Sequence, residues 1–177
     1  GLVGSEMCIR DRMLCYLFMT IGNSARLAAQ TEIISNHPFE VVISAGDVKL
    51  YVSEMQLRTD RLKRHHNSED VEFAGSKLDE LVLSLDEPVT RINDLYLGNA
   101  EDVQNLRNTL ALLQSEQKDY LVFCEQQNLT EKEIEAYAQE HLEPLYDRAL
   151  QQTGEIIAVA QAKKVGYGTV SYTHLRA

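Results

Sequence analysis

The residues best suited to binding chemistry form a run of cations in an otherwise acidic chain. Six basic side chains fall within residues 58–66: Arg58, Arg61, Lys63, Arg64, His65 and His66. Arg58, Arg61 and Arg64 recur every three residues, so on a helix they share one face. Guanidinium groups suit bidentate binding of carboxylates. We therefore predict that these three arginines bind a small anion or carboxylate. The alternative is a solvated helix end whose cations complement the helix dipole.

The other reactive side chains do not form a catalytic or metal-binding pattern. Di-metal carboxylate bundles use Glu-x-x-His pairs, but no glutamate stands three residues before His37, His65, His66 or His141. Adjacent His65 and His66 would point about 100° apart on a helix and chelate poorly. Cys124 falls on an apolar stripe and is predicted to be a core residue and not a nucleophile. Gln117, on the same stripe, is predicted to be a polar core or rim residue; the alternative is a hydrogen-bonder for a ligand. We expect no catalytic residue, no metal site and no cofactor, and hence no enzyme.

Composition excludes several classes of protein. The chain has 177 residues and a net charge of −10, from 17 basic and 27 acidic side chains, which argues against nucleic acid as a partner. An apolar content of 44% is too high for a disordered chain. Three cysteines make an odd count and none has zinc-ligand spacing, so a secreted disulfide scaffold is not expected.

Both ends of the chain match translated sequencing adapter. The transposon-end adapter of fragment libraries encodes residues 170–177 in one frame, and its reverse complement encodes residues 2–11. The two adapter bases before the first of these codons also fit Thr169. Foreign segments are excluded from fold reasoning. We therefore predict that residues 1–12 and 169–177 are adapter artefacts and that the native part is an internal fragment over about residues 13–168.

The first native stretch, residues 13–21, is apolar, and no charged residue follows before Arg26. A membrane-spanning helix needs about 20 apolar residues, so this run is too short alone. Because adapter sequence interrupts it, we interpret it as the C-terminal part of a transmembrane helix. Residues 13–34 then form a partial transmembrane and juxtamembrane helix. The alternatives are a buried core helix or the end of a signal peptide.

Four later stretches carry apolar residues at steps of three and four, the period of an amphipathic helix. The first two stripes are Val41, Ala45, Val48, Val52, Met55, Thr59 and Leu62, then Val71, Ala74, Leu78, Leu81, Leu85, Pro88, Ile92 and Leu95. The last two are Val103, Leu106, Leu110, Leu113, Gln117, Tyr120 and Cys124, then Leu142, Leu145, Ala149, Gln152, Ile156 and Val159.

Local signals mark where these helices begin, bend and end. Asn67 can cap the second helix, and the residues from Thr130 to Glu133 form a capping box. Pro88 predicts a kink, because its stripe continues in phase. Gly98 predicts a helix end in the C′ position. Pro144 predicts the first turn of, or a kink in, the last long helix.

Together these features predict an all-α fold, an up-down-up-down antiparallel four-helix bundle over residues 35–168. An even number of antiparallel helices returns the chain to the end where it began. The apolar run at residues 13–21 and the native end near Gly168 then face the same side. Tyr167, after two lysines, suits an interfacial anchor of a second span.

Three short stretches carry a resemblance to a known family. They are residues 34–41 around His37-Pro38-Phe39, residues 92–99 with the turn Tyr96-Leu97-Gly98, and residues 129–136 at the start of the fourth helix. Their order resembles the four-helix-bundle sensor domain of bacterial chemotaxis receptors, the methyl-accepting chemotaxis proteins, and of related diguanylate cyclases and histidine kinases. Residues 55–62 follow the family's methionine-arginine pattern only loosely.

The resemblance implies a domain outside the bacterial inner membrane, in the periplasm, that dimerises through helix one and binds a small molecule near the dimer interface. Binding would shift the helix that leads into a second span, and a cytoplasmic output domain would respond. The predicted function is therefore ligand sensing in a transmembrane signal transducer. The alternative is a membrane-anchored helical scaffold or assembly protein without a ligand.

Overall fold

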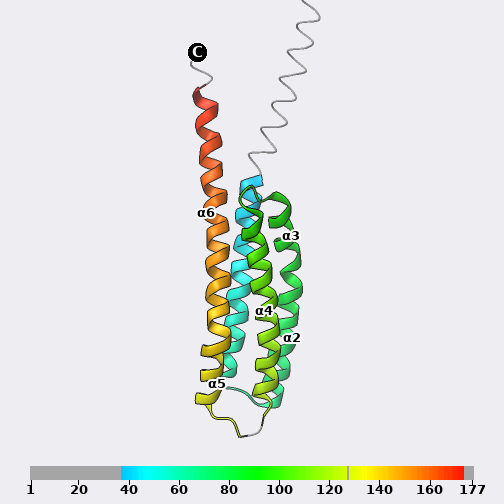
Figure 1. Cartoon of the computed structure of the whole chain (residues 1–177). Helices are drawn as coiled ribbons and strands as arrows, with labels where there is room; N and C mark the ends of the chain where they lie inside the picture. Colours follow the sequence, from blue (N-terminus) through cyan, green and yellow to red (C-terminus); the bar gives the residue numbers. More distant parts are fainter. Residues whose placement is uncertain (1–36, 127, 174–177) are drawn as a thin grey trace, which may run out of the picture. The chain divides into compact units, whose positions relative to one another are not determined.

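The computed structural model describes residues 37–126 and 128–173, which are almost entirely helical and contain no β-strand. Residues from Pro38 onward form one compact unit, and the description below concerns that unit. A first helix covers residues 37–62 and is called helix 37–62 below. It is followed by α2 (Ser68–Ser84), α3 (Asp86–Leu95), α4 (Ala100–Cys124), α5 (Glu131–Tyr137), the π-helical turn η1 (Ala138–Leu142) and α6 (Glu143–Thr173) (Figure 1).

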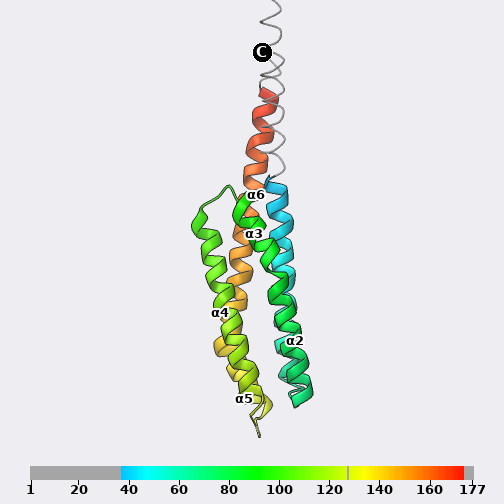
Figure 2. The same ribbon diagram turned by 90° about the vertical axis from the view of Figure 1, so that its right-hand side faces the viewer.

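These elements make four helical segments that lie side by side (Figures 1 and 2). The segments are helix 37–62, α2 with α3, α4, and α5 with η1 and α6. One end of the unit brings together Pro38, the α3–α4 turn at Gly98, and Lys163 of α6, which line a common surface depression. The opposite end joins helix 37–62 to α6 through Lys63 Nζ and Glu143 Oε1, 3.0 Å apart.

Side-chain caps begin the helices where the sequence predicts them. The Asn67 side chain accepts a hydrogen bond from the Asp70 backbone at 2.9 Å. At Thr130 and Glu133 the predicted capping box is present: the Thr130 backbone N–H donates to Glu133 Oε2 at 2.8 Å, and the Glu133 N–H donates to Thr130 Oγ1 at 3.4 Å. Each cap satisfies N–H groups that have no partner within their own helix.

The predicted kink at Pro88 lies instead three residues earlier, at Leu85, which separates α2 from α3. A proline ring clashes with the carbonyl four residues before it, and that residue is Ser84, the last of α2. The Leu85 N–H still donates to the Leu81 carbonyl at 3.2 Å, so α3 continues in phase with α2. Pro144 lies in the first turn of α6, as predicted, directly after the wider turn η1.

The predicted role of Gly98 is wrong. Helix α3 ends at Leu95, and none of the described glycines has a positive φ. Gly98 is required for a different reason, because a β-carbon there would collide with the ring of Tyr96. The Tyr96 hydroxyl in turn donates to Asp102 Oδ2 at 2.7 Å and fastens the turn to the start of α4.

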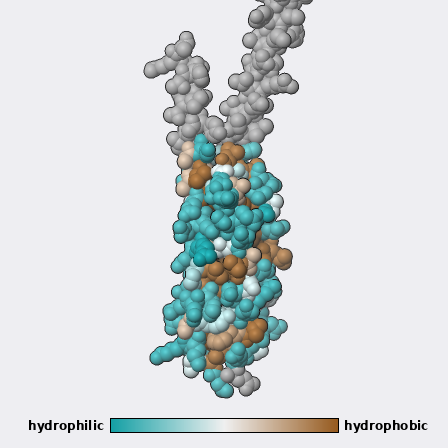
Figure 3. Space-filling view, in the orientation of Figure 1, coloured by the Kyte–Doolittle hydropathy of each residue, from teal (hydrophilic) through white to brown (hydrophobic). Residues whose placement is uncertain are grey.

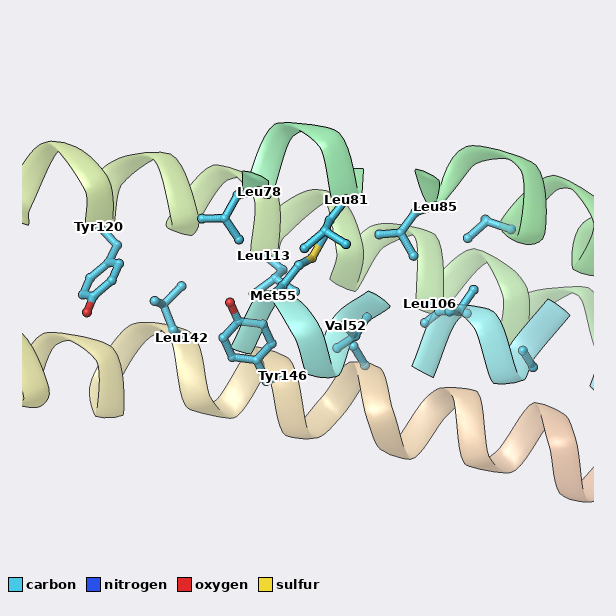
Figure 4. Close-up of a cluster of buried hydrophobic side chains, with 14 of the residues drawn as sticks. Val52, Met55, Leu78, Leu81, Leu85, Leu106, Leu113, Tyr120, Leu142 and Tyr146 are labelled. Carbon is cyan, nitrogen blue, oxygen red and sulfur yellow. The ribbon is translucent and has the colours of Figure 1, made fainter. Parts of the chain in front are cut away.

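The core confirms the first three stripes almost completely. All their members are buried except Leu95 and Leu110, which are partly buried at the edge of the core. The central side chains of the cluster point toward one another from all four segments (Figure 4).

In the fourth stripe every second predicted residue is wrong, because the residue after it is the buried one. The buried residues of this segment are Leu142, Tyr146, Ala149, Thr153, Ile156 and Ala160. Leu145, Gln152 and Val159 are only partly buried. Leu145 and Val159 were predicted to be buried because their side chains are apolar. The residues that are buried instead include Tyr146 and Thr153, whose side chains carry hydroxyl groups.

Several predictions concern the ends of the chain. Residues 1–12 and the partial transmembrane helix at 13–34 lie outside the described residues. Among the helices that are described, none is both long enough and apolar enough to cross a membrane. Helix α6 continues to Thr173, so the backbone of residues 169–173, predicted to be adapter-derived, is helical.

Candidate functional site

The basic cluster lies at the end of helix 37–62 that adjoins α6. The helix ends at Leu62, so Arg64 lies in the turn that follows and not on the helix as predicted. The turn keeps a helical winding, because the backbone N–H groups of Arg64 and His65 both donate to the Arg61 carbonyl, at 3.2 and 3.1 Å. Arg58, Arg61 and Arg64 all line one hollow of about 370 Å³.

The three arginines differ in their electrostatic environment. Arg58 is partly buried and pairs with Glu54 at 2.9 Å, while its Nε is buried without a hydrogen-bond partner. Arg61 and Arg64 are exposed, and neither has an ion-pair partner among the described residues. Two guanidinium groups therefore remain available to an anion at this end of the helix.

Lys63 belongs to the same basic run but has a structural role. Its Nζ lies 2.8 Å from Asp60 and 3.0 Å from Glu143, at the start of α6. Burial alone would lower the pKa of the Lys63 ammonium, but its hydrogen bonds to the two carboxylates outweigh burial and raise the pKa. Lys63 thus ties helix 37–62 to α6 and is not free for a ligand.

An exposed apolar series, not predicted from the sequence, runs along the outer face of helix 37–62. Ile43, Leu50 and Leu57 are seven residues apart and remain 43%, 61% and 66% exposed. The small residues Gly46 and Ser53 fill the intermediate positions of the same repeat. We call these five residues the outer seam. Its last member, Leu57, also lines the hollow of the three arginines.

The outer seam could have been found from the sequence as a second heptad series beside the buried stripe. The buried stripe is longer and more apolar, and it alone determined the predicted helix face. Figure 3 shows the opposite side of the unit, where separate apolar patches also interrupt the hydrophilic surface. Exposed apolar residues that form a continuous series are typical of interaction surfaces.

A buried polar layer crosses the core at Gln117. Gln117 is 2% exposed, which confirms its prediction as a polar core residue. Its Nε2 donates to the Tyr146 hydroxyl on α6 at 2.9 Å, and that hydroxyl lies 3.3 Å from Thr59 Oγ1 on helix 37–62. Burial raises the pKa of Tyr146 to about 12, so the phenol is neutral and can donate a hydrogen bond.

A lateral groove of about 330 Å³ opens beside this layer, between α2–α3 and α4. Gln117 and Met55 belong to its lining, together with apolar residues of both flanking segments. Neither Tyr146 nor the groove was predicted, because both depend on how separate helices meet.

Cys124 lies in the core, as its place on the third stripe predicts. Cys124 is 2% exposed, and burial raises its pKa to about 11, so the thiol is protonated near neutral pH. His141 Nδ1 lies 3.8 Å from Glu116 Oε2, and the His141 ring contacts the ring of Tyr137 in a tilted arrangement with 4.4 Å between the ring centres. Within the described residues, no group of three His, Cys, Asp or Glu side chains could hold a metal ion.

Comparisons with known proteins give no match: no family model, no curated protein and no solved structure is significantly similar to the chain.

Proposed function

We propose that this chain is the extracytoplasmic ligand-sensing domain of a bacterial transmembrane signal transducer, such as a chemoreceptor, a diguanylate cyclase or a histidine kinase. In this proposal its four segments form an up-down-up-down antiparallel bundle that works as a dimer. The observation that carries the proposal is the outer seam, which runs directly into arginines without ion-pair partners.

The outer seam has the spacing of a coiled-coil interface. Knobs-into-holes packing uses apolar residues at alternating steps of four and three, and from Ile43 to Leu57 the seam follows those steps. A two-fold dimer pairs the same patch of both copies. A second copy of this chain is therefore the occupant that this face fits best.

The steps continue from Leu57 to Arg61 and then to Arg64. A dimer paired along the seam would bring four guanidinium groups without ion-pair partners close together. Their mutual repulsion opposes dimerisation, and an anion bound between the subunits would relieve it. An anionic ligand, such as a small carboxylate, then favours one arrangement of the two helices over another.

The ends of the domain are suited to pass on such a change. Pro38 and Lys163 contribute to the same end of the unit, and α6 is a 31-residue helix that extends beyond Lys163. A transducer needs both the entering and the leaving helix at its membrane-facing end. The arginines are at the opposite end, so a signal would travel along helix 37–62 and α6, which Lys63 joins.

The first test is a thermal-shift screen of small carboxylates, including amino acids and dicarboxylates. A ligand at a hundredfold excess over Kd stabilises the state that it binds by about 2.7 kcal/mol. We expect at least one carboxylate to raise Tm, and Arg61→Ala and Arg64→Ala to abolish the rise. Arg148→Ala, an exposed arginine on α6, is the matched control and should leave it unchanged.

The second test is the oligomeric state by sedimentation equilibrium. Leu50→Glu places a charge in the middle of the outer seam and should dissociate the dimer. Leu83→Glu, at a 78% exposed leucine on α2, is the matched control. A monomeric wild-type chain, or equal effects of both substitutions, would contradict the proposed interface. A stable dimer that no carboxylate stabilises would favour the membrane-anchored scaffold.

A further inference from the structure

We propose that the lateral groove between α2–α3 and α4 is a second ligand site, which binds a small uncharged phenol or alcohol by its apolar body and its hydroxyl. The site lies within one chain. It needs neither a dimer nor a membrane, so it is independent of the sensor function proposed above.

The groove lies beside the junction of α2 and α3. Leu85, the residue at the break, lines the groove with Val82 and Val89 on one side. Leu110 and Leu113 of α4 form the other side, and Met55 of helix 37–62 reaches it from within the core. The volume of about 330 Å³ falls within the range of small-molecule pockets. Its apolar walls favour an apolar ligand body.

The hydrogen bonds of the polar layer determine which polar group Gln117 offers to a ligand at the buried end of the groove. Thr59 Oγ1 donates to the Gln56 carbonyl at 2.9 Å, so it can only accept from the Tyr146 hydroxyl. The Tyr146 oxygen must then accept from its other neighbour, Gln117 Nε2, 2.9 Å away. In this arrangement the Gln117 amide presents Nε2 to Tyr146 and leaves Oε1 for another partner.

The amide oxygen of Gln117 is consequently left over. Within the described residues Oε1 makes no hydrogen bond, and it is not one of the fully enclosed polar atoms that lack a partner, so it faces the groove that Gln117 lines. An amide oxygen can only accept a hydrogen bond. A ligand hydroxyl that enters the groove can donate to it in place of water. The ligand would extend a chain of bonds that all run in one direction, which strengthens each of them.

The mouth of the groove explains why the ligand should be uncharged. Asp86 and Arg107 both line it, are exposed, and have opposite charges. Neither has an ion-pair partner among the described residues, so both are solvated there. Their opposite signs give the mouth no net preference for an anion or a cation. Selectivity therefore comes from the apolar walls and Gln117.

The test compares p-cresol with toluene, which has the same shape without the hydroxyl, by calorimetric titration of the full chain. One net hydrogen bond is worth roughly 1 kcal/mol, so p-cresol should bind about threefold to tenfold more tightly than toluene. Gln117→Met replaces the amide by an apolar side chain of similar length. It should abolish this preference while toluene still binds.

A second pair of variants keeps the test valid if Gln117→Met does not fold. Ala111→Trp fills the groove from an exposed position on its rim and should abolish binding of both compounds. Leu112→Trp, on the adjacent 53% exposed residue outside the groove, is the matched control and should bind both normally. No preference for p-cresol in the wild-type chain, or binding that survives Ala111→Trp, would overturn the proposal. Arg61→Ala should leave p-cresol binding unchanged, which separates this site from the proposed anion site.

Discussion

The substitution Tyr146→Phe tests the buried polar layer most directly. It removes only the hydroxyl oxygen that connects α6 to Gln117 and Thr59 and leaves the ring in the core. Tyr146 is 1% exposed, so water does not replace the lost partner. We expect the Gln117 amide to lose its hydrogen-bond acceptor inside the core, while Thr59 keeps its bond to the Gln56 carbonyl.

The expected loss of unfolding free energy follows from the number of hydrogen-bond partners that Tyr146→Phe removes. One buried donor left without an acceptor costs about 1–3 kcal/mol. Thr59 loses a donor to its hydroxyl oxygen, but that hydroxyl stays bonded to the backbone and adds little. Replacing both partners by apolar groups of the same shape can be nearly neutral. The double variant Tyr146→Phe with Gln117→Met should therefore be more stable than the sum of the two single changes predicts.

The assay is urea unfolding of the wild type, both single variants and the double variant, with the midpoint compared at constant m-value. The coupling free energy of the double-mutant cycle should lie between about 0.5 and 3 kcal/mol. Additive effects, or a change below about 0.5 kcal/mol for Tyr146→Phe, would refute the described layer.

The same variant changes the response to alkaline pH. Burial raises the pKa of Tyr146 from its ordinary value of 10.0 to about 12. The folded state therefore holds this proton more tightly than the unfolded state. The resulting stability is fully present below pH 10 and is lost between about pH 10 and 12. Tyr146→Phe should lose less stability than the wild type over that interval, although other buried tyrosines still contribute.

Three further predictions concern the core and the ends. Alanine at Ile92, Leu106 or Ile156, all 0% exposed, should cost about 2–5 kcal/mol in urea unfolding, whereas alanine at the exposed Leu83 should cost less than about 0.5 kcal/mol. Cys124 should react with a thiol reagent in the native state far more slowly than in the unfolded chain, because the thiol is buried and its pKa is raised to about 11; equal rates would contradict this placement. Deleting residues 1–12 and 169–177 should leave Tm within error, and a large decrease would show that these segments are not foreign to the fold.

Periodicity predicts the helices and most of the core, because a helix must bury one stripe wherever it packs. The capping residues Asn67 and Thr130 are equally local, so they too could be predicted. Local sequence signals do not predict features that depend on how side chains or helices pack against one another. Gly98 is needed because the Tyr96 ring folds over it, not for a positive φ. In α6, whether Leu145 or Tyr146 faces the core depends on hydrogen-bond partners for the Tyr146 hydroxyl on other helices, here Gln117 and Thr59.

In the candidate sites, too, some features follow from local residue spacing and others depend on contacts between separate parts of the chain. The spacing of Arg58, Arg61 and Arg64 predicted one shared helix face, whereas the structure places Arg64 in the turn after the helix and all three around one hollow. The spacing could not predict that Glu54 pairs with Arg58 while Arg61 and Arg64 have no ion-pair partner in the part of the chain that the structure describes. The lateral groove had no sequence signal, since Leu85 and Leu110 appear in the sequence as ordinary core residues and line the groove only once α2–α3 and α4 are packed together.

The polar layer also distinguishes the segments from one another. It joins α4, α6 and helix 37–62 through Gln117, Tyr146 and Thr59. Among the described residues, α2–α3 takes no part in it and makes one ion pair with helix 37–62, the exposed pair of Arg91 and Glu40 at 3.4 Å. The pKa of Glu80 on α2 is lowered mainly by Lys77 and also by the charge of Arg58 on helix 37–62. An exposed ion pair such as that of Arg91 and Glu40 is worth at most about 1 kcal/mol. The α2–α3 segment is thus held mainly by apolar contacts, and the groove lies at its boundary with α4. A ligand that fills the groove would add contacts where the segments are least tied together.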